Sequence, residues 1–219
     1  MKIKLLIFGI VLTLFSGCGK SPQEVMQIGQ EHLLNEKYDF ALESFQIVFE
    51  KHPNDPLADS AGYQIARVYL DCLNDYDNGY KTLNSLVNNY PDSDYGIRSR
   101  EEIRQFPNWL FTTAETKRNA KDINGSIKTL DYLVNKFPSH EIAPKAQYLI
   151  GDIYMNDQRN FDLAIDSYRK IIIDFPGSKQ EPHAQFMIGY IYANVLDDSE
   201  NAQIEYNLFL QKYPDHELT

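Results

Sequence analysis

The stretch "KFPSHEIAPKAQYLIGDIY" runs from Lys136 to Tyr154, and 38 residues later the chain reads "DFPGSKQEPHAQFMIGYIY", from Asp174 to Tyr192. The two stretches carry prolines, small residues and aromatic residues at equal positions. Self-similarity at a fixed period is typical of repeat proteins, in which each copy is one structural unit. The fold of this chain therefore depends on a unit of 38 residues.

An aromatic residue or histidine followed by proline marks the end of each copy. The marker occurs repeatedly, and successive marker prolines are 38, 47, 38 and 38 residues apart. Proline ends a helix because it has no N–H to donate and because it pushes the preceding residue toward an extended conformation. We therefore expect a structural role for the marker prolines, which are Pro53, Pro91, Pro138, Pro176 and Pro214.

Each marker closes a segment whose apolar residues recur at helical spacing, such as "YDFALESFQIVFEKHP" and "NFDLAIDSYRKIIIDFP". A second helical segment precedes each of them, for example "ADSAGYQIARVYL". The unit is therefore a helical hairpin, and hairpins in tandem stack into a solenoid with a continuous core because none can bury its apolar stripe alone. Small residues that we expect to be structural are Gly29, Ala41, Ala66, Gly151, Ala164, Gly189 and Ala202.

These positions resemble the tetratricopeptide repeat, which has a small residue at its eighth position, Tyr at the eleventh, Ala near the twentieth, an aromatic residue four later and Pro at its end. In the fourth repeat they fall on Gly151, Tyr154, Ala164, Tyr168 and Pro176. The resemblance predicts an all-α solenoid of about five repeats across residues 24–214. The expected repeats are 24–55, 56–91, 92–138, 139–176 and 177–214, followed by a tail at 215–219.

The third repeat departs from this pattern because it is nine residues longer and contains Pro107 in "DYGIRSREEIRQFPNWLFTT". Its first part can be one long helix kinked at Pro107 or two short helices. Either arrangement predicts a bend or break of the solenoid between Tyr90 and Asn119.

The N-terminus "MKIKLLIFGIVLTLFSGCGK" has the layout of a secretory signal. Two lysines precede an eleven-residue apolar run, Leu5 to Phe15, which is too short to span a membrane. Small residues before Cys18 resemble the lipobox of bacterial lipoproteins, although Phe15 departs from its first position. We expect a signal peptide at residues 1–17, a lipidated Cys18 and a tether at residues 18–23; an ordinary signal peptide cut nearby is the alternative.

The residue after Cys18 and the charge of the chain predict its location. Gly19 stands where an Asp would resemble an inner-membrane retention signal, so we expect an outer-membrane protein that faces the periplasm. Loss of residues 1–17 removes two lysines and no acid, which changes the formal net charge from −10 to −12. Such a chain repels phosphate, so nucleic acid is not an expected partner and the lipid anchor has to hold it on the membrane.

The chain lacks the short motifs of catalysis and cofactor binding. There is no HExxH, GxSxG, CxxC or Gly-rich phosphate loop, and the five histidines have no metal-ligand spacing. The sequence therefore predicts a binding protein rather than an enzyme. We expect no cofactor, no metal and no small-molecule substrate.

A solenoid offers a long concave surface made by the first helices of its hairpins, which suits peptide or helical partners. In the repeat register, the fifth and ninth positions line this surface. Aromatic residues there favour apolar or aromatic partner side chains, with one Arg and one Asp to fix orientation; the alternative is that the aromatics only pack between helices. The candidate partner-binding residues are Tyr63, Arg67, Tyr148, Asp152, Phe186 and Tyr190.

A lipid-anchored solenoid with junctions such as "FPGS" resembles the BamD-type outer-membrane assembly lipoproteins, which also carry five tetratricopeptide repeats behind a lipidated Cys. The resemblance implies a scaffold that binds envelope proteins and acts in the assembly of β-barrel proteins. The last two repeats also resemble the C-terminal domain of a periplasmic cell-division coordinator of the Tol-Pal system. That role, or an adaptor role in another envelope complex, is the alternative.

Overall fold

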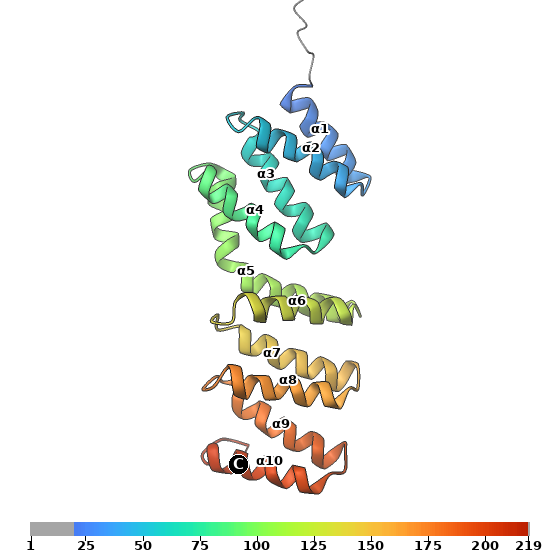
Figure 1. Ribbon diagram of the computed structural model, residues 1–219, viewed down its shortest axis with the longest axis vertical. Coiled ribbons are helices and arrows are strands. Elements are labelled where there is room, and N and C mark those ends of the chain that lie inside the picture. The colour runs from blue at the N-terminus through green and yellow to red at the C-terminus, as the bar shows by residue number, and fades with distance from the viewer. Residues whose placement is uncertain (1–19, 219) are drawn as a thin grey trace, which may run out of the picture. The chain divides into compact units, whose positions relative to one another are not determined.

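The computed structural model describes residues 20–218, and every regular element in that range is a helix. The predicted all-α fold of tetratricopeptide-like hairpins is therefore confirmed (Figure 1). The first helices of the hairpins are α1 (Pro22–Leu34), α3 (Ala58–Arg67), α5 (Asp94–Asn119), α7 (Ala143–Asp152) and α9 (Gln180–Asn194). The second helices are α2 (Tyr38–Lys51), α4 (Tyr76–Asn89), α6 (Ile123–Lys136), α8 (Phe161–Asp174) and α10 (Ser199–Lys212).

Two first helices end in π-helical segments that the sequence did not predict. These segments are η1 (Val68–Leu73) after α3 and η2 (Ile153–Asp157) after α7. The signal-like segment and Cys18 lie outside the described residues.

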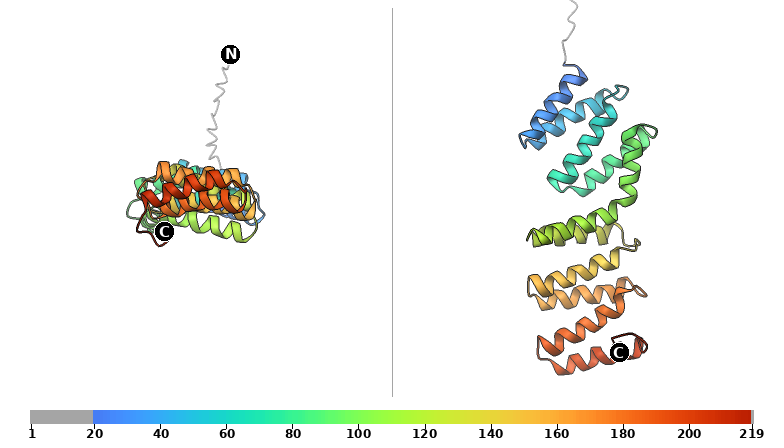
Figure 2. Two further views of the ribbon diagram at one scale, coloured as in Figure 1. Left: turned by 90° about the horizontal axis from the view of Figure 1, so that it is seen from below. Right: turned by 180° about the vertical axis from the view of Figure 1, so that it is seen from behind.

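The chain forms two compact units, one ending at Ser99 and one beginning at Arg100. The boundary lies inside α5, within the stretch where the sequence predicted an interruption. This helix is continuous over 26 residues and contains Pro107, so of the two arrangements proposed for this region the structure has one long helix. In each unit the hairpins follow one another in sequence order, as the view from behind also shows (Figure 2).

The turns between first and second helices share one design. Each contains a single non-glycine residue with φ between 51° and 67°: Glu36, Asn74, Lys121, Arg159 or Asp197. In four turns the next residue is Asp or Asn, and its side chain accepts the backbone N–H three residues later, which caps the second helix. These caps are Asp75, Asp122, Asn160 and Asp198, whereas Lys37 before α2 makes no side-chain cap.

Each second helix ends two residues before its marker proline, and a single residue precedes the proline outside the helix. That preceding residue has φ between −127° and −134° and ψ between 50° and 56°, which is outside the helical region. A proline imposes this restriction on its predecessor. Pro53, Pro91, Pro138, Pro176 and Pro214 themselves are exposed.

Small residues lie where the two helices of a hairpin approach each other. A Cβ atom added to Gly151 would be 2.6 Å from Cε1 of Tyr168, and one added to Gly29 would be 2.5 Å from Cε1 of Phe45. Gly189 has the same relation to Tyr206. The expected small residues on the other helices, Ala41, Ala66, Ala164 and Ala202, are all buried.

Candidate partner-binding surface

Tyr148 and Asp152 lie one helical turn apart on α7 and both contact Tyr168 of α8. The Tyr168 hydroxyl donates a hydrogen bond to Oδ1 of Asp152 at 2.8 Å, and the ring centroids of Tyr148 and Tyr168 are 5.2 Å apart. Tyr168 is fully buried, whereas Tyr148 and Asp152 are partly buried. The fold thus groups two predicted partner-binding residues around a buried tyrosine.

Burial controls the ionisation of this cluster. It raises the pKa of Tyr148 to about 12, with a further contribution from the charge of Asp152. Burial also raises the pKa of Asp152, while the Tyr168 hydrogen bond and the charge of Arg118 act in the opposite direction. At neutral pH both tyrosines are neutral, and the partly buried Tyr148 can interact with a partner through apolar contacts and hydroxyl hydrogen bonds.

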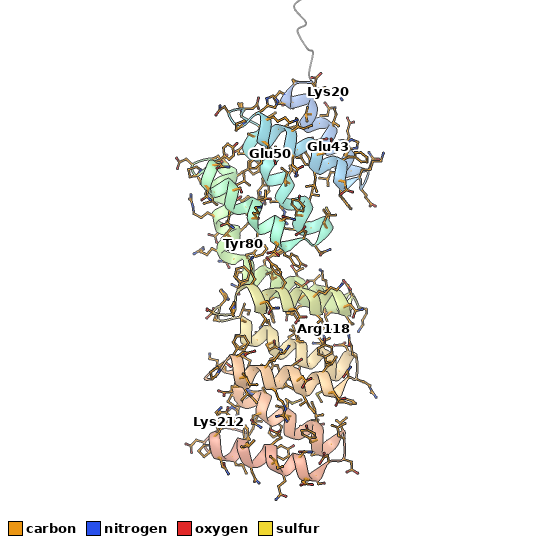
Figure 3. All side chains as sticks on the ribbon, viewed as in Figure 1. Lys20, Glu43, Glu50, Tyr80, Arg118 and Lys212 are labelled. Carbon is orange, nitrogen blue, oxygen red and sulfur yellow. The ribbon has the colours of Figure 1, made fainter. Side chains whose placement is uncertain are left out.

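Arg118 of α5, labelled in Figure 3, forms an ion pair with Asp157 of η2, and its charge also acts on Asp152. Its Nε donates to Oδ2 of Asp157 at 2.6 Å, and the side chains of this ion pair are 25% and 19% exposed. A hollow of about 360 Å³ lies beside it, between α5 and α7, and Arg118, Leu149 and four polar residues of α5 line it. The polar lining favours hydrogen bonding by a partner at this point.

Phe186 and Tyr190 lie on α9, which contacts α7. Phe186 is partly buried, with ring centroids 5.6 Å from Tyr206 and 5.9 Å from Phe209. Tyr190 is 38% exposed. We call Tyr148, Asp152, Phe186 and Tyr190 the first-helix face of the second unit; within it, Tyr190 offers an aromatic ring to solvent.

The two remaining candidates belong to α3 of the first unit. Tyr63 is 5% exposed, its ring centroid is 5.0 Å from that of Tyr95, and Cζ of Arg98 lies 4.8 Å from its centroid. Arg67 forms an ion pair with Asp71 one turn later, with Nε 2.8 Å from Oδ2. The Tyr63 ring is therefore mostly covered by its own unit, while the Arg67 side chain is 29% exposed.

The second helices of the second unit carry a surface that sequence reasoning missed. A hollow of about 420 Å³ lies between α6 and α8, and Asp131, Tyr154 and Ile173 are among its lining residues. Exposed apolar side chains occur on α8 and α10, with Ile173 73% and Ile204 50% exposed. Alignment of the repeats gives a signal for Ile204, because the equivalent residues of the other repeats are all charged: Glu43, Lys81, Lys128 and Asp166.

Residues 20–218 contain neither a metal-binding cluster nor a membrane-spanning helix. No group of three or more His, Cys, Asp or Glu residues in this range is placed to hold a metal ion. None of the helices in the same range combines the length and apolar character of a membrane span. Cys72 is a free, partly buried thiol whose pKa is raised by burial.

A family model described as an outer membrane lipoprotein, YfiO, matches residues 19–156, which is more than half of the chain. The chain belongs to the YfiO family. A tetratricopeptide-repeat model matches residues 145–178 and 183–216, so the last two hairpins of this YfiO-family chain also carry a recognised repeat. These matches agree with the predicted resemblance to an outer-membrane lipoprotein built from tetratricopeptide repeats.

Several solved structures are similar to this YfiO-family chain. One structure of MamA has a TM-score of 0.40 and 18% identity, covering 85% of this chain and 95% of that one. MamA from Desulfovibrio magneticus RS-1 has a TM-score of 0.39 and 16% identity, with 91% and 98% covered. A thermophilic tetratricopeptide-repeat protein of Thermus thermophilus has a TM-score of 0.35 and 18% identity, with 89% and 93% covered. No curated protein matches the chain by sequence.

Proposed function

We propose that this protein is a scaffold, lipidated at Cys18, that faces the periplasm from the outer membrane and binds partners during assembly of β-barrel proteins. The observation that carries the proposal is the YfiO family match. That match begins at residue 19, directly after Cys18 and after the apolar run that resembles a signal peptide. The position supports a mature protein that starts with the lipidated cysteine.

The first-helix face of the second unit is the partner-binding surface in this proposal. Tyr148, Phe186 and Tyr190 supply aromatic area, and aromatic residues contribute a large share of binding energy where they are desolvated by a partner. Asp152 is partly buried on the same face, and its carboxylate accepts a hydrogen bond from Tyr168. A carboxylate has room for more than one donor. A partner segment with apolar or aromatic side chains and a hydrogen-bond donor fits this surface.

Photo-crosslinking in living cells tests the proposal. A photoreactive amino acid replaces Tyr190, with Cys18 intact, and crosslinked proteins are identified by mass spectrometry. The matched control places the same probe at Lys170, which is exposed on α8 and lies outside the first-helix face. We expect position 190 to capture a β-barrel insertase or nascent barrel proteins and position 170 to capture little of either.

Two other results would change the assignment. Capture of peptidoglycan-linked or Tol-type proteins at position 190 would favour the cell-division coordinator, and equal capture at both positions would remove the first-helix face as the binding surface. In a purified system, Tyr190→Ala should weaken capture of the identified partner while far-UV circular dichroism stays unchanged, because this side chain is 38% exposed.

A further inference from the structure

Helix α1 is the terminal helix of the first unit, and one of its faces is packed on α2 while the opposite face is exposed. Val25, Met26 and Gly29 are buried on the packed side. Gln23, Gln27, Gln30 and Leu34 are exposed. They follow one another at intervals of four, three and four residues, which places them on a single stripe of the helix.

This stripe is uncharged in a chain with 24% charged residues. The neighbouring acids are engaged within the helix: Glu24 closes the capping box with Ser21, and Glu31 accepts a hydrogen bond from Gln27 at 3.3 Å. The stripe ends in Leu34, whose side chain is 84% exposed, and Phe40 just beyond the turn is 57% exposed. They are the two most exposed large apolar side chains among the described residues of the first unit and flank one turn, and exposed apolar area gathered at one place marks a membrane or protein contact.

The position of α1 in the chain indicates what covers Leu34 and Phe40. Only three residues separate Cys18 from Pro22, so an extended tether of four residue steps spans at most about 14 Å. Helix α1 has 13 residues and is about 20 Å long, so when it lies parallel to the membrane its whole exposed stripe is within reach of the headgroup region. Here the inference rests on the proposed lipidation of Cys18.

We propose that α1 lies on the phospholipid surface, with Leu34 inserted into the bilayer and the three glutamines among the headgroups. Glutamine amide N–H groups donate hydrogen bonds to phosphate and ester oxygens. The four residues of the stripe carry no charge of their own for an anionic surface to repel. Because the stripe has few apolar residues, the anchor first holds it close to the membrane, and insertion is then an intramolecular step.

Depth-dependent fluorescence quenching tests this placement on the full lipidated chain. Cys72 is replaced by Ser, a single cysteine is introduced by Leu34→Cys, and the thiol is labelled with the environment-sensitive dye NBD. The protein is reconstituted into vesicles of acyl-brominated phospholipid. The matched control is Ile97→Cys, since Ile97 is also an exposed apolar residue of the first unit, 53% exposed, but belongs to α5.

We expect the label at position 34 to be quenched by brominated lipid several-fold more than the label at position 97, and to be protected from aqueous iodide. Equal behaviour of the two labels would overturn the inference. Protection from iodide without quenching by lipid would also overturn it, because a second copy of the protein would then cover Leu34. Protein that fails to float with the vesicles would refute the anchor itself, so failure of the proposed function is distinguishable from failure of this placement.

Discussion

The N-terminus of α2 lacks the side-chain cap that the other second helices have, and Lys37→Asn should supply it. Lys37 has φ −89° and ψ 67°, close to the values of −80° and 71° at the capping residue Asp122. The backbone is thus already in the conformation that a cap requires. An Asn side chain at this position should accept the backbone N–H of Phe40 without rearrangement, and we expect the variant to be more stable than the natural protein.

The expected gain is about 1 kcal/mol, the usual contribution of an N-cap side chain. Removal of the lysine charge from a helix N-terminus adds about 0.3–1 kcal/mol in the same direction. Lys37→Ala isolates this second effect because it removes the charge and provides no cap. In urea denaturation followed by far-UV circular dichroism, with an m-value of about 2 kcal/mol/M, the cap alone should raise the midpoint by about 0.5 M relative to Lys37→Ala.

Equal midpoints for Lys37→Asn and Lys37→Ala would refute this reasoning, because the two variants differ in the cap and share the loss of charge. The reverse experiment uses a turn that already has its cap. Asp122 accepts the backbone N–H of Gly125 at 2.9 Å, so Asp122→Ala should lose about 1 kcal/mol in the same assay.

Three further predictions concern the hairpins. Gly151→Ala should destabilise the protein in urea by about 1–3 kcal/mol, because the new Cβ would lie 2.6 Å from Cε1 of Tyr168; a gain in stability, as for an unobstructed helical glycine, would contradict the close approach. Burial raises the folded-state pKa of Asp152, so its ionised form destabilises the fold at neutral pH, and this cost disappears as the pH falls through the folded pKa toward the unfolded value. Asp152→Asn keeps an acceptor for Tyr168, so this variant should be more stable than the natural protein near pH 7 and lose that advantage near pH 3. A gain in stability that does not depend on pH would exclude the charge of Asp152 as its cause. Lys121 has φ 67°, so Lys121→Val should cost about 1–2 kcal/mol by thermal unfolding while Lys121→Asn should be tolerated, and equal melting temperatures would argue against a left-handed residue there.

The hairpins could be predicted from sequence because their determinants are local and repeated. A proline restricts the residue before it wherever it occurs, so Pro138 and Pro176 end helices in the same way. A small residue on one helix needs a large one opposite, and Gly151 and Tyr168 appear in the sequence at the spacing of one hairpin. The turns between the helices are also determined locally and repeat from hairpin to hairpin. Their left-handed residues are of different types, so the repeat pattern did not predict them.

The candidate binding surface was less predictable because exposure depends on neighbours that are remote in sequence. Tyr63 and Tyr148 hold equivalent repeat positions, yet Tyr63 is covered by Tyr95 and Arg98 from the next hairpin while Tyr148 packs on Tyr168. Periodicity assigns both to the same face and does not distinguish these surroundings. The sequence did not decide whether one helix continues through Pro107, for a similar reason. The packing around a proline determines whether a helix tolerates it.

The sequence by itself determined that this chain is a series of helical hairpins, and it predicts a lipoprotein signal before them. Helix period, proline restriction and small-to-large pairing each act within one hairpin or between adjacent ones. Only the tertiary structure decided how the aromatic residues are used, which acids and bases form pairs, and which apolar side chains, such as Leu34 and Ile204, are left exposed. The physical reason is that burial and electrostatic environment are properties of assembled neighbours, whereas backbone conformation is largely set by the residues that adopt it.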